Sequence, residues 1–143
     1  MKHILSTITA LFIILTSLVS WSESLTMDDL VERNELYYKK FTDNPFTGEI
    51  SGIENGSFKN GKMNGEWLRY YENGQLNEKV NFKDGKRDGL SETYFENGQL
   101  KDKGNYKDGK EEGLWEYFNK DGSLEKTETF KDGKLISCEG KCD

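Results

Sequence analysis

The residues that could catalyse a reaction are few in this chain of 143 residues. Its single histidine is His3, which lies in an N-terminal segment that we expect to be removed. The remaining chain then lacks an imidazole, the usual general base near neutral pH, so neither a Ser-His-Asp nor a Cys-His arrangement can be built. None of the 26 Asp and Glu residues forms an evident catalytic pair. The sequence therefore predicts a protein that is not an enzyme and that uses no cofactor.

Two cysteines, Cys138 and Cys142, lie near the C-terminus with three residues between them. Two thiolates without a third or fourth nearby ligand do not make a zinc site. In an oxidising compartment, such a pair closes a small disulfide loop. Its stabilising effect is modest, because few residues lie inside the loop. We therefore expect a disulfide and no metal at this end of the chain.

Aromatic side chains and one arginine form the first candidate binding site. Trp, Tyr and Arg dominate the hot spots of protein interfaces, so such a set suits a peptide, a glycan or a partner protein. The alternative is that the rings only shield the second face of a single sheet. The six residues occupy odd-numbered positions in the predicted strands and turns: Trp67, Arg69, Tyr71, Phe95, Trp115 and Tyr117.

Lysines that recur at the predicted turns form the second candidate. They would line one long edge of the sheet, where they could meet lipid headgroups or polyanions of the cell wall. Asp and Glu residues are interleaved with them, so the alternative is that they only provide solubility and protect the edge. The residues concerned are Lys83, Lys86, Lys107, Lys110, Lys131 and Lys134, with Lys59 and Lys62 at the preceding turn.

The net charge of the chain is −6. Binding along nucleic acid requires a cationic surface that neutralises phosphates, so nucleic acid is excluded as a general partner. The expected partner is an unidentified protein or a component of the cell envelope, and contact with a membrane is a further possibility.

Residues 65–136 consist of three segments of 24 residues that align without gaps: 65–88, 89–112 and 113–136. A fixed period of this kind is typical of repeat architectures. Each segment contains two runs of aromatic and β-branched residues, and Asn-Gly or Asp-Gly pairs follow the runs. These pairs supply the positive φ angles that tight turns need. Each segment is therefore predicted to form a β-hairpin.

The turn at Asn73-Gly74 allows two registers. A two-residue turn would place Tyr71 opposite Leu76, whereas a three-residue loop with a bulge at Gly74 would place Tyr70 there. We expect the second register, because it keeps the aromatic residue beside the leucine in all three repeats. It would also place even-numbered residues on one face, namely Leu68, Tyr70, Leu76, Val80, Phe82, Leu90, Tyr94, Leu100, Tyr106, Leu114, Phe118, Leu124 and Phe130.

The composition favours an all-β fold, built as an elongated single-sheet array of β-hairpin repeats. After residue 22 there are 16 aromatic residues but only 15 Leu, Ile and Val, and no alanine, which is too little aliphatic volume for two packed sheets. Residues 23–64 would form an N-terminal cap and a degenerate half-repeat. Within the cap, Thr26 and Asp29 resemble a capping box at the start of a short helix of about residues 27–33. Residues 137–143 would form a tail that contains the cysteines.

The first 22 residues have the pattern of a secretory signal peptide. Lys2 and His3 precede an uncharged apolar run of 16 residues, Ile4 to Val19, which is shorter than the ~20 residues of a membrane-spanning helix. Ser20 and Ser22 fit the small-x-small rule for cleavage, and Ser24 offers a second option. We expect a secreted or periplasmic protein, with an uncleaved membrane anchor as the alternative.

The segments Gly65 to Leu76 and Asn105 to Lys110 resemble the MORN repeat variant of many bacterial proteins, and Leu30 to Glu49 resembles the lead-in of secreted members. The resemblance covers roughly residues 30–135. It departs at Ser91, where the other repeats have tryptophan, and at residues 119–121, where they read aromatic-Glu-Asn. It implies an elongated sheet of hairpins and a role in interaction. Some relatives are catalogued as antitoxin components, and MORN repeats elsewhere have been linked to phospholipids.

These observations together predict a secreted or periplasmic repeat module that binds a protein or an envelope partner through its aromatic sheet face. One alternative is an immunity or antitoxin-like protein. The other is a structural scaffold that is associated with the membrane or the cell envelope through its lysine-lined edge.

Overall fold

The computed structural model describes residues 24–142, and almost all of them lie in strands or in the turns between strands. A 3-10 helix, η1 (Met27–Asp29), precedes eleven strands. They are β1 (Leu30–Arg33), β2 (Leu36–Lys39), β3 (Gly48–Ile50), β4 (Glu54–Lys59), β5 (Lys62–Tyr70), β6 (Leu76–Lys83), β7 (Lys86–Tyr94), β8 (Leu100–Lys107), β9 (Lys110–Phe118), β10 (Leu124–Lys131) and β11 (Lys134–Gly140). The expected signal peptide, residues 1–22, lies outside the described residues.

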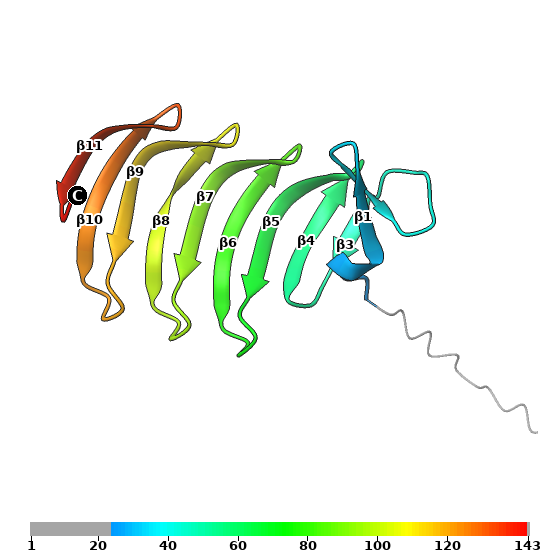
Figure 1. Ribbon diagram of the computed structural model, residues 1–143, viewed down its shortest axis with the longest axis horizontal. Helices are drawn as coiled ribbons and strands as arrows, with labels where there is room; N and C mark the ends of the chain where they lie inside the picture. Colours follow the sequence, from blue (N-terminus) through cyan, green and yellow to red (C-terminus); the bar gives the residue numbers. More distant parts are fainter. Residues whose placement is uncertain (1–23, 143) are drawn as a thin grey trace, which may run out of the picture.

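Strands β3 to β11 form one open antiparallel sheet, in which each strand pairs with the strands before and after it in the chain. They lie side by side in chain order along the long axis of the molecule (Figure 1). The prediction of an all-β, elongated single sheet of hairpin repeats is therefore confirmed. Within residues 24–142, no helix is long and apolar enough to cross a membrane.

Two kinds of connection alternate along the sheet. At one edge, two-residue turns such as Asp84-Gly85 have positive φ at both residues, 50° and 84°, as the type I′ turns of hairpins require. At the opposite edge, longer loops such as residues 71–75 are closed by hydrogen bonds from Tyr71 N to Gln75 O and from Gly74 N to Tyr71 O. The 24-residue period therefore contains one tight turn and one long loop.

The predicted register at the long loops is confirmed, because Tyr70 pairs with Leu76, as do the equivalent residues of the other two repeats. The predicted common face of even-numbered residues is wrong. A β-bulge between the pairs of Tyr70 and Arg69 shifts the register by one residue. As a result, Trp67 lies opposite Val80 and Leu68 lies opposite Lys79. Because side chains alternate with a period of two, a shift of one residue moves the rest of the strand to the other face.

One face of the sheet, which we call the Trp face, carries the row Trp67, Val80, Ser91, Gly104 and Trp115. All five residues are buried. The opposite face, which we call the Leu face, carries Leu68, Leu90 and Leu114 together with Lys79 and Lys103. The apolar residues of the repeats are thus divided between two faces, and their fully buried members, Trp67, Val80 and Trp115, lie on the Trp face.

The N-terminal cap is a hairpin, and the predicted helix over residues 27–33 is wrong. Asp29 Oδ2 accepts a hydrogen bond from Thr26 N at 2.8 Å, but helical structure ends at Asp29. A single turn rarely sustains a helix, and the following residues instead pair as β1 and β2 through a turn with φ of 53° at Asn34 and 63° at Glu35. Leu30 of this segment packs into the core cluster, and the cap covers the first end of the Trp face.

Candidate functional site

Trp67 and Trp115, the centre of the predicted aromatic site, are core residues with 0% and 4% of their surface exposed. The ring of Trp67 packs against Phe58 and Phe82 at centroid distances of 5.0 and 5.9 Å. The ring of Trp115 packs against Tyr106 at 5.1 Å. The interpretation of these tryptophans as partner-contacting residues is therefore wrong, because the bulge in β6 brings Val80 and Phe82 onto the face of Trp67, where they pack around the indole.

Glycines opposite the tryptophans make room for the indoles. A Cβ at Gly56 would collide with the ring of Trp67, and one at Gly104 would collide with that of Trp115. In the second repeat, Ser91 occupies the tryptophan position and Val80 the glycine position. The volume lost at one position is thus partly restored at its cross-strand neighbour, which explains the irregularity at Ser91.

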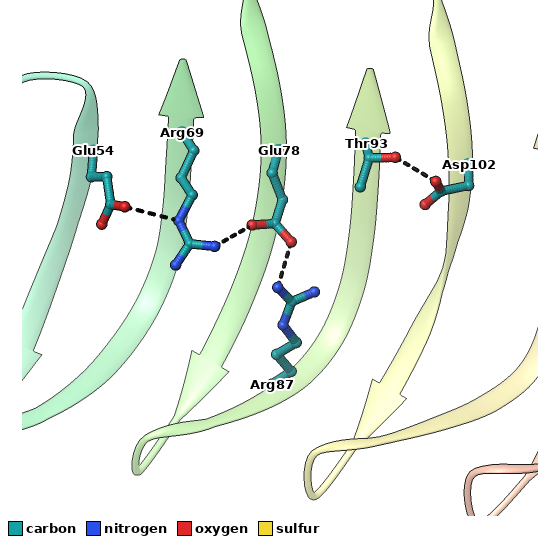
Figure 2. Close-up of polar contacts among 6 residues, drawn as sticks. All are labelled: Glu54, Arg69, Glu78, Arg87, Thr93 and Asp102. Carbon is teal, nitrogen blue, oxygen red and sulfur yellow. Dashed lines mark hydrogen bonds and ion pairs between the residues drawn. The ribbon is translucent and has the colours of Figure 1, made fainter. Parts of the chain in front are cut away.

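Arg69, the third predicted site residue, belongs to an ion-pair ladder on the Trp face (Figure 2). Its guanidinium lies 3.2 Å from Glu54 Oε1 and donates a hydrogen bond to Glu78 Oε2 at 2.7 Å. Arg87 Nη2 reaches the second oxygen, Glu78 Oε1, at 2.6 Å. Glu78 is only 6% exposed, so two arginines hold one buried carboxylate across three strands.

The same row continues toward the C-terminal end with other polar residues. Thr93 donates a hydrogen bond to Asp102 (Figure 2), and Tyr117, opposite Asp102, lies beside Glu128 and Lys126. Burial and the nearby Glu128 carboxylate raise the pKa of the Tyr117 hydroxyl far above its usual value. The hydrogen bond from Lys126, at 2.7 Å, lowers the pKa of Glu128. This row is a partly buried polar layer of the Trp face.

The two remaining predicted residues, Tyr71 and Phe95, lie at the long-loop edge. The hydroxyl of Tyr71 donates a hydrogen bond to the backbone oxygen of Tyr94 at 2.7 Å. The ammonium of Lys120 lies 5.9 Å from the ring centre of Phe95. The structure therefore does not bring the six predicted residues together: four lie on the Trp face and two join neighbouring loops.

The Leu face is not covered by any other described element, and its leucines are partly exposed. Leu90 is 40% and Leu114 is 55% exposed. Beside them runs a charged row in which Lys79 lies 3.0 Å from Glu66 and Lys103 lies 2.8 Å from Glu116. These leucines were predicted on the common face of even-numbered residues, together with Val80 and Phe82. The Glu and Lys residues that alternate with them are the signal that points to an open face instead.

The predicted lysine edge forms a regular row. At each two-residue turn, the flanking lysines pair directly across the hairpin, as Lys83 with Lys86 and Lys107 with Lys110. All of them are exposed. The described ion pairs of residues 24–142 include only one of these lysines, Lys131, whose ammonium lies 2.6 Å from Glu112.

A family model decides what the repeats are. The model described as the MORN repeat variant matches residues 63–84, 87–108 and 111–132. The chain belongs to the MORN repeat variant family. Each matched stretch contains one first strand, one long loop and one second strand, and it ends at a two-residue turn.

Among solved structures, the chain is similar to a crystal structure of accessory secretory protein 1,2 and 3 in Streptococcus pneumoniae. The identity is 18% and the TM-score is 0.38, and the match covers 78% of this chain and 20% of that one. This chain thus spans about a fifth of the length of that protein. No curated protein matches the sequence.

A shallow hollow of about 680 Å³ lies before the long loop of the first MORN repeat. It is lined by Tyr70, Tyr71 and Ile53, and Ile53 is 65% exposed. The loop at residues 51–53 is shorter than the long loops of the MORN repeats, so the first of them has no loop of equal length stacked before it. The hollow extends the Leu face at its N-terminal end.

Cys138 and Cys142 form a disulfide at the other end of the array. Cys138 lies opposite Glu128, on the side of the Trp face. Lys141 N donates a hydrogen bond to Glu125 O at 3.3 Å. The tail after β11 is therefore folded back against β10.

Proposed function

We propose that this chain is an exported, non-enzymatic interaction module, and that the Leu face contacts a partner protein in the cell envelope. Export is proposed from the pattern of residues 1–22 and agrees with the disulfide, because disulfides persist in oxidising compartments. The MORN repeats provide an extended sheet rather than a catalytic cleft.

The observation that carries the proposal is the contrast between the two faces. The Trp face is filled by its own indoles and by the N-terminal hairpin. The Leu face leaves Leu90 and Leu114 partly exposed beside two ion pairs. Apolar residues that lie beside polar ones, on a surface without a cover, are typical of protein interfaces.

Site-specific photo-crosslinking tests this assignment in the native host. A benzoylphenylalanine at position 114 would lie on the Leu face, whereas one at position 41 replaces the fully exposed Phe41 of the N-terminal region. We expect a discrete adduct from position 114 and none from position 41. Adducts of equal yield at both positions, or at neither, would reject the Leu face as the contact surface.

A paired substitution separates contact from folding. Leu90→Ser with Leu114→Ser removes apolar surface that is already exposed, so the circular dichroism of the sheet should be retained. In the same background, the adduct from a crosslinker at position 116 should be lost. If that adduct persists, the leucines do not contribute to the contact.

A further inference from the structure

The lysines of the tight turns form four directly facing pairs. The pairs are Lys59 with Lys62, Lys83 with Lys86, Lys107 with Lys110, and Lys131 with Lys134. Each pair flanks a two-residue turn with a glycine at its second position. Alternation along β6 places Lys83 on the same side as Lys79, so the row borders the Leu face at its turn edge.

The arrangement is unfavourable for the isolated protein. Like charges directly opposite each other destabilise an antiparallel pair, and the array repeats this conflict four times. In the described part of the chain, only Lys131 of the eight lysines has a carboxylate within ion-pair distance. A type I′ turn needs positive φ at its two central residues and does not require lysine beside them. A local rule that is broken repeatedly, with an ion pair to one of the eight lysines among the described residues, is typical of a functional surface.

The turns hold the pairs at fixed intervals. Gly85 N donates to Met63 O at 2.9 Å, and Gly109 N and Gly133 N donate in the same way to Arg87 O and Glu111 O at 2.8 and 3.0 Å. The turns therefore lie next to one another along one long edge of the sheet (Figure 1). Successive pairs are two strands apart, or about 10 Å, so the four pairs span about 30 Å.

We propose that this lysine row binds a single linear polymer of phosphate groups, which lies along the turn edge of the sheet. Each facing pair offers two ammonium groups to one stretch of the chain, and lysine binds phosphate as a point charge. Because the array fixes the intervals in advance, a polymer that spans several pairs gains affinity without a new kind of contact.

The charge of the rest of the protein favours a thin polymer over a broad anionic surface. Eight of the 20 Lys and Arg residues lie in the row and three aspartates, Asp84, Asp108 and Asp132, lie in its turns, which leaves 12 cationic against 23 acidic residues elsewhere. At physiological ionic strength, charges are screened over about 8 Å. A narrow polymer on the row therefore meets more lysines than turn aspartates, whereas a flat membrane would also meet the acidic remainder.

Calorimetric titration of the disulfide-bonded protein with inorganic polyphosphate tests the proposal. A chain long enough to span about 30 Å should bind at least roughly tenfold more tightly than tripolyphosphate at equal phosphate concentration. The central pairs are then removed with Lys83→Gln, Lys86→Gln, Lys107→Gln and Lys110→Gln. This variant should bind the long chain roughly tenfold or more weakly, and its slope of log affinity against log salt should fall by about 2.8, since each neutralised charge contributes about 0.7.

A matched control changes the same number of exposed lysines outside the row: Lys39→Gln, Lys40→Gln, Lys101→Gln and Lys120→Gln. Its affinity should stay within about twofold of the parent, since Lys101 and Lys120 lie at the opposite, long-loop edge of the sheet and Lys39 and Lys40 lie outside the row. An equal loss in both variants would show that only net charge matters, and equal affinity for short and long chains would exclude alignment along the row. Undetectable binding, or tighter lysine-dependent binding to phosphatidylglycerol vesicles than to the polymer, would also overturn the proposal.

Discussion

The indole of Trp115 lies so close to Gly104 on the neighbouring strand that no side chain fits between them. Gly104 has no positive φ in the structure, so its backbone would accept another residue, and the indole alone excludes one. The indole of Trp115 therefore occupies the volume that a side chain at position 104 would need, and substitutions at the two positions can test this.

We expect Gly104→Val to destabilise the protein by about 1–3 kcal/mol, because it overpacks a filled core. Adding Trp115→Ser should recover part of that loss, since the double variant reproduces the combination of Val80 and Ser91 found in the second repeat. Urea unfolding of the two single variants and the double variant measures the coupling. Strictly additive losses would mean that the two positions do not share one space.

The second prediction concerns the ion-pair ladder. Glu78→Gln leaves Arg69 and Arg87 without their shared carboxylate, and it should cost about 1–3 kcal/mol. The estimate lies below that for a fully buried pair, because both arginine side chains are about one third exposed (33% and 30%). Glu66→Gln, which breaks the exposed pair with Lys79, should cost less than about 1 kcal/mol. If the two variants show the same loss in denaturant melts, burial does not strengthen the ladder.

The third prediction concerns stability in acid. The hydrogen bond from Lys126 lowers the pKa of Glu128 in the folded protein below its ordinary value of 4.5. The stabilisation from Glu128 is therefore fully present above that value and is lost as the pH falls through the folded-state pKa. Glu128→Gln should be less stable than the parent at pH 7, and the difference should shrink below about pH 4.5. A difference that stays constant from pH 7 to pH 3 in thermal melts would contradict this role.

The fourth prediction uses the confirmed pairing of Tyr94 with Leu100 in the central repeat. Leu100→Ala should cost about 1–2 kcal/mol, below the range for a fully buried leucine, because the site is only partly covered. Leu124→Ala should cost less, since Leu124 is 54% exposed and its repeat is nearer the end of the array. Lys101→Ala, an exposed neighbour, should stay within about 0.5 kcal/mol. Equal losses at positions 100 and 101 in urea melts would reject the pairing.

The fifth prediction concerns export. Mass spectrometry of the protein from its native host should find an N-terminus at Glu23 or Leu25, because the expected cleavage sites follow Ser22 and Ser24. A protein that retains Met1 or Lys2 would reject the proposal of a cleaved signal peptide.

The fold was predictable because turn chemistry and period are local. Asn-Gly and Asp-Gly pairs at intervals of 24 residues determine where hairpins begin, and the pairing of Tyr70 with Leu76 follows from the loop at Gly74. Which face of the sheet each side chain lies on was not predictable, because the bulge beside the pair of Tyr70 and Leu76 leaves no mark in the composition. Trp67 and Leu68 are both apolar, so the sequence around them fits either face equally well.

The site was predictable only where it depended on turns. The lysines lie on the expected edge because they flank Asp-Gly and Asn-Gly pairs. The aromatic site depended on which face of the sheet each side chain lies on, and it was therefore misplaced. Its ion pair was missed for the same reason, since the predicted register places Arg69 opposite Asn77 and only the bulge brings Glu78 opposite Arg69.

The pairing of each strand only with its neighbours in the chain has a kinetic consequence. Most β proteins fold slowly because distant segments must meet before any contact stabilises them. Here a hairpin can close as soon as its own two strands are free, and the next one can add to its edge. The pairing of the earlier strands does not require the C-terminal strands to be present. A chain that emerges in order from a narrow pore can therefore acquire its structure strand by strand, and the last strand added always presents the edge on which the next one pairs.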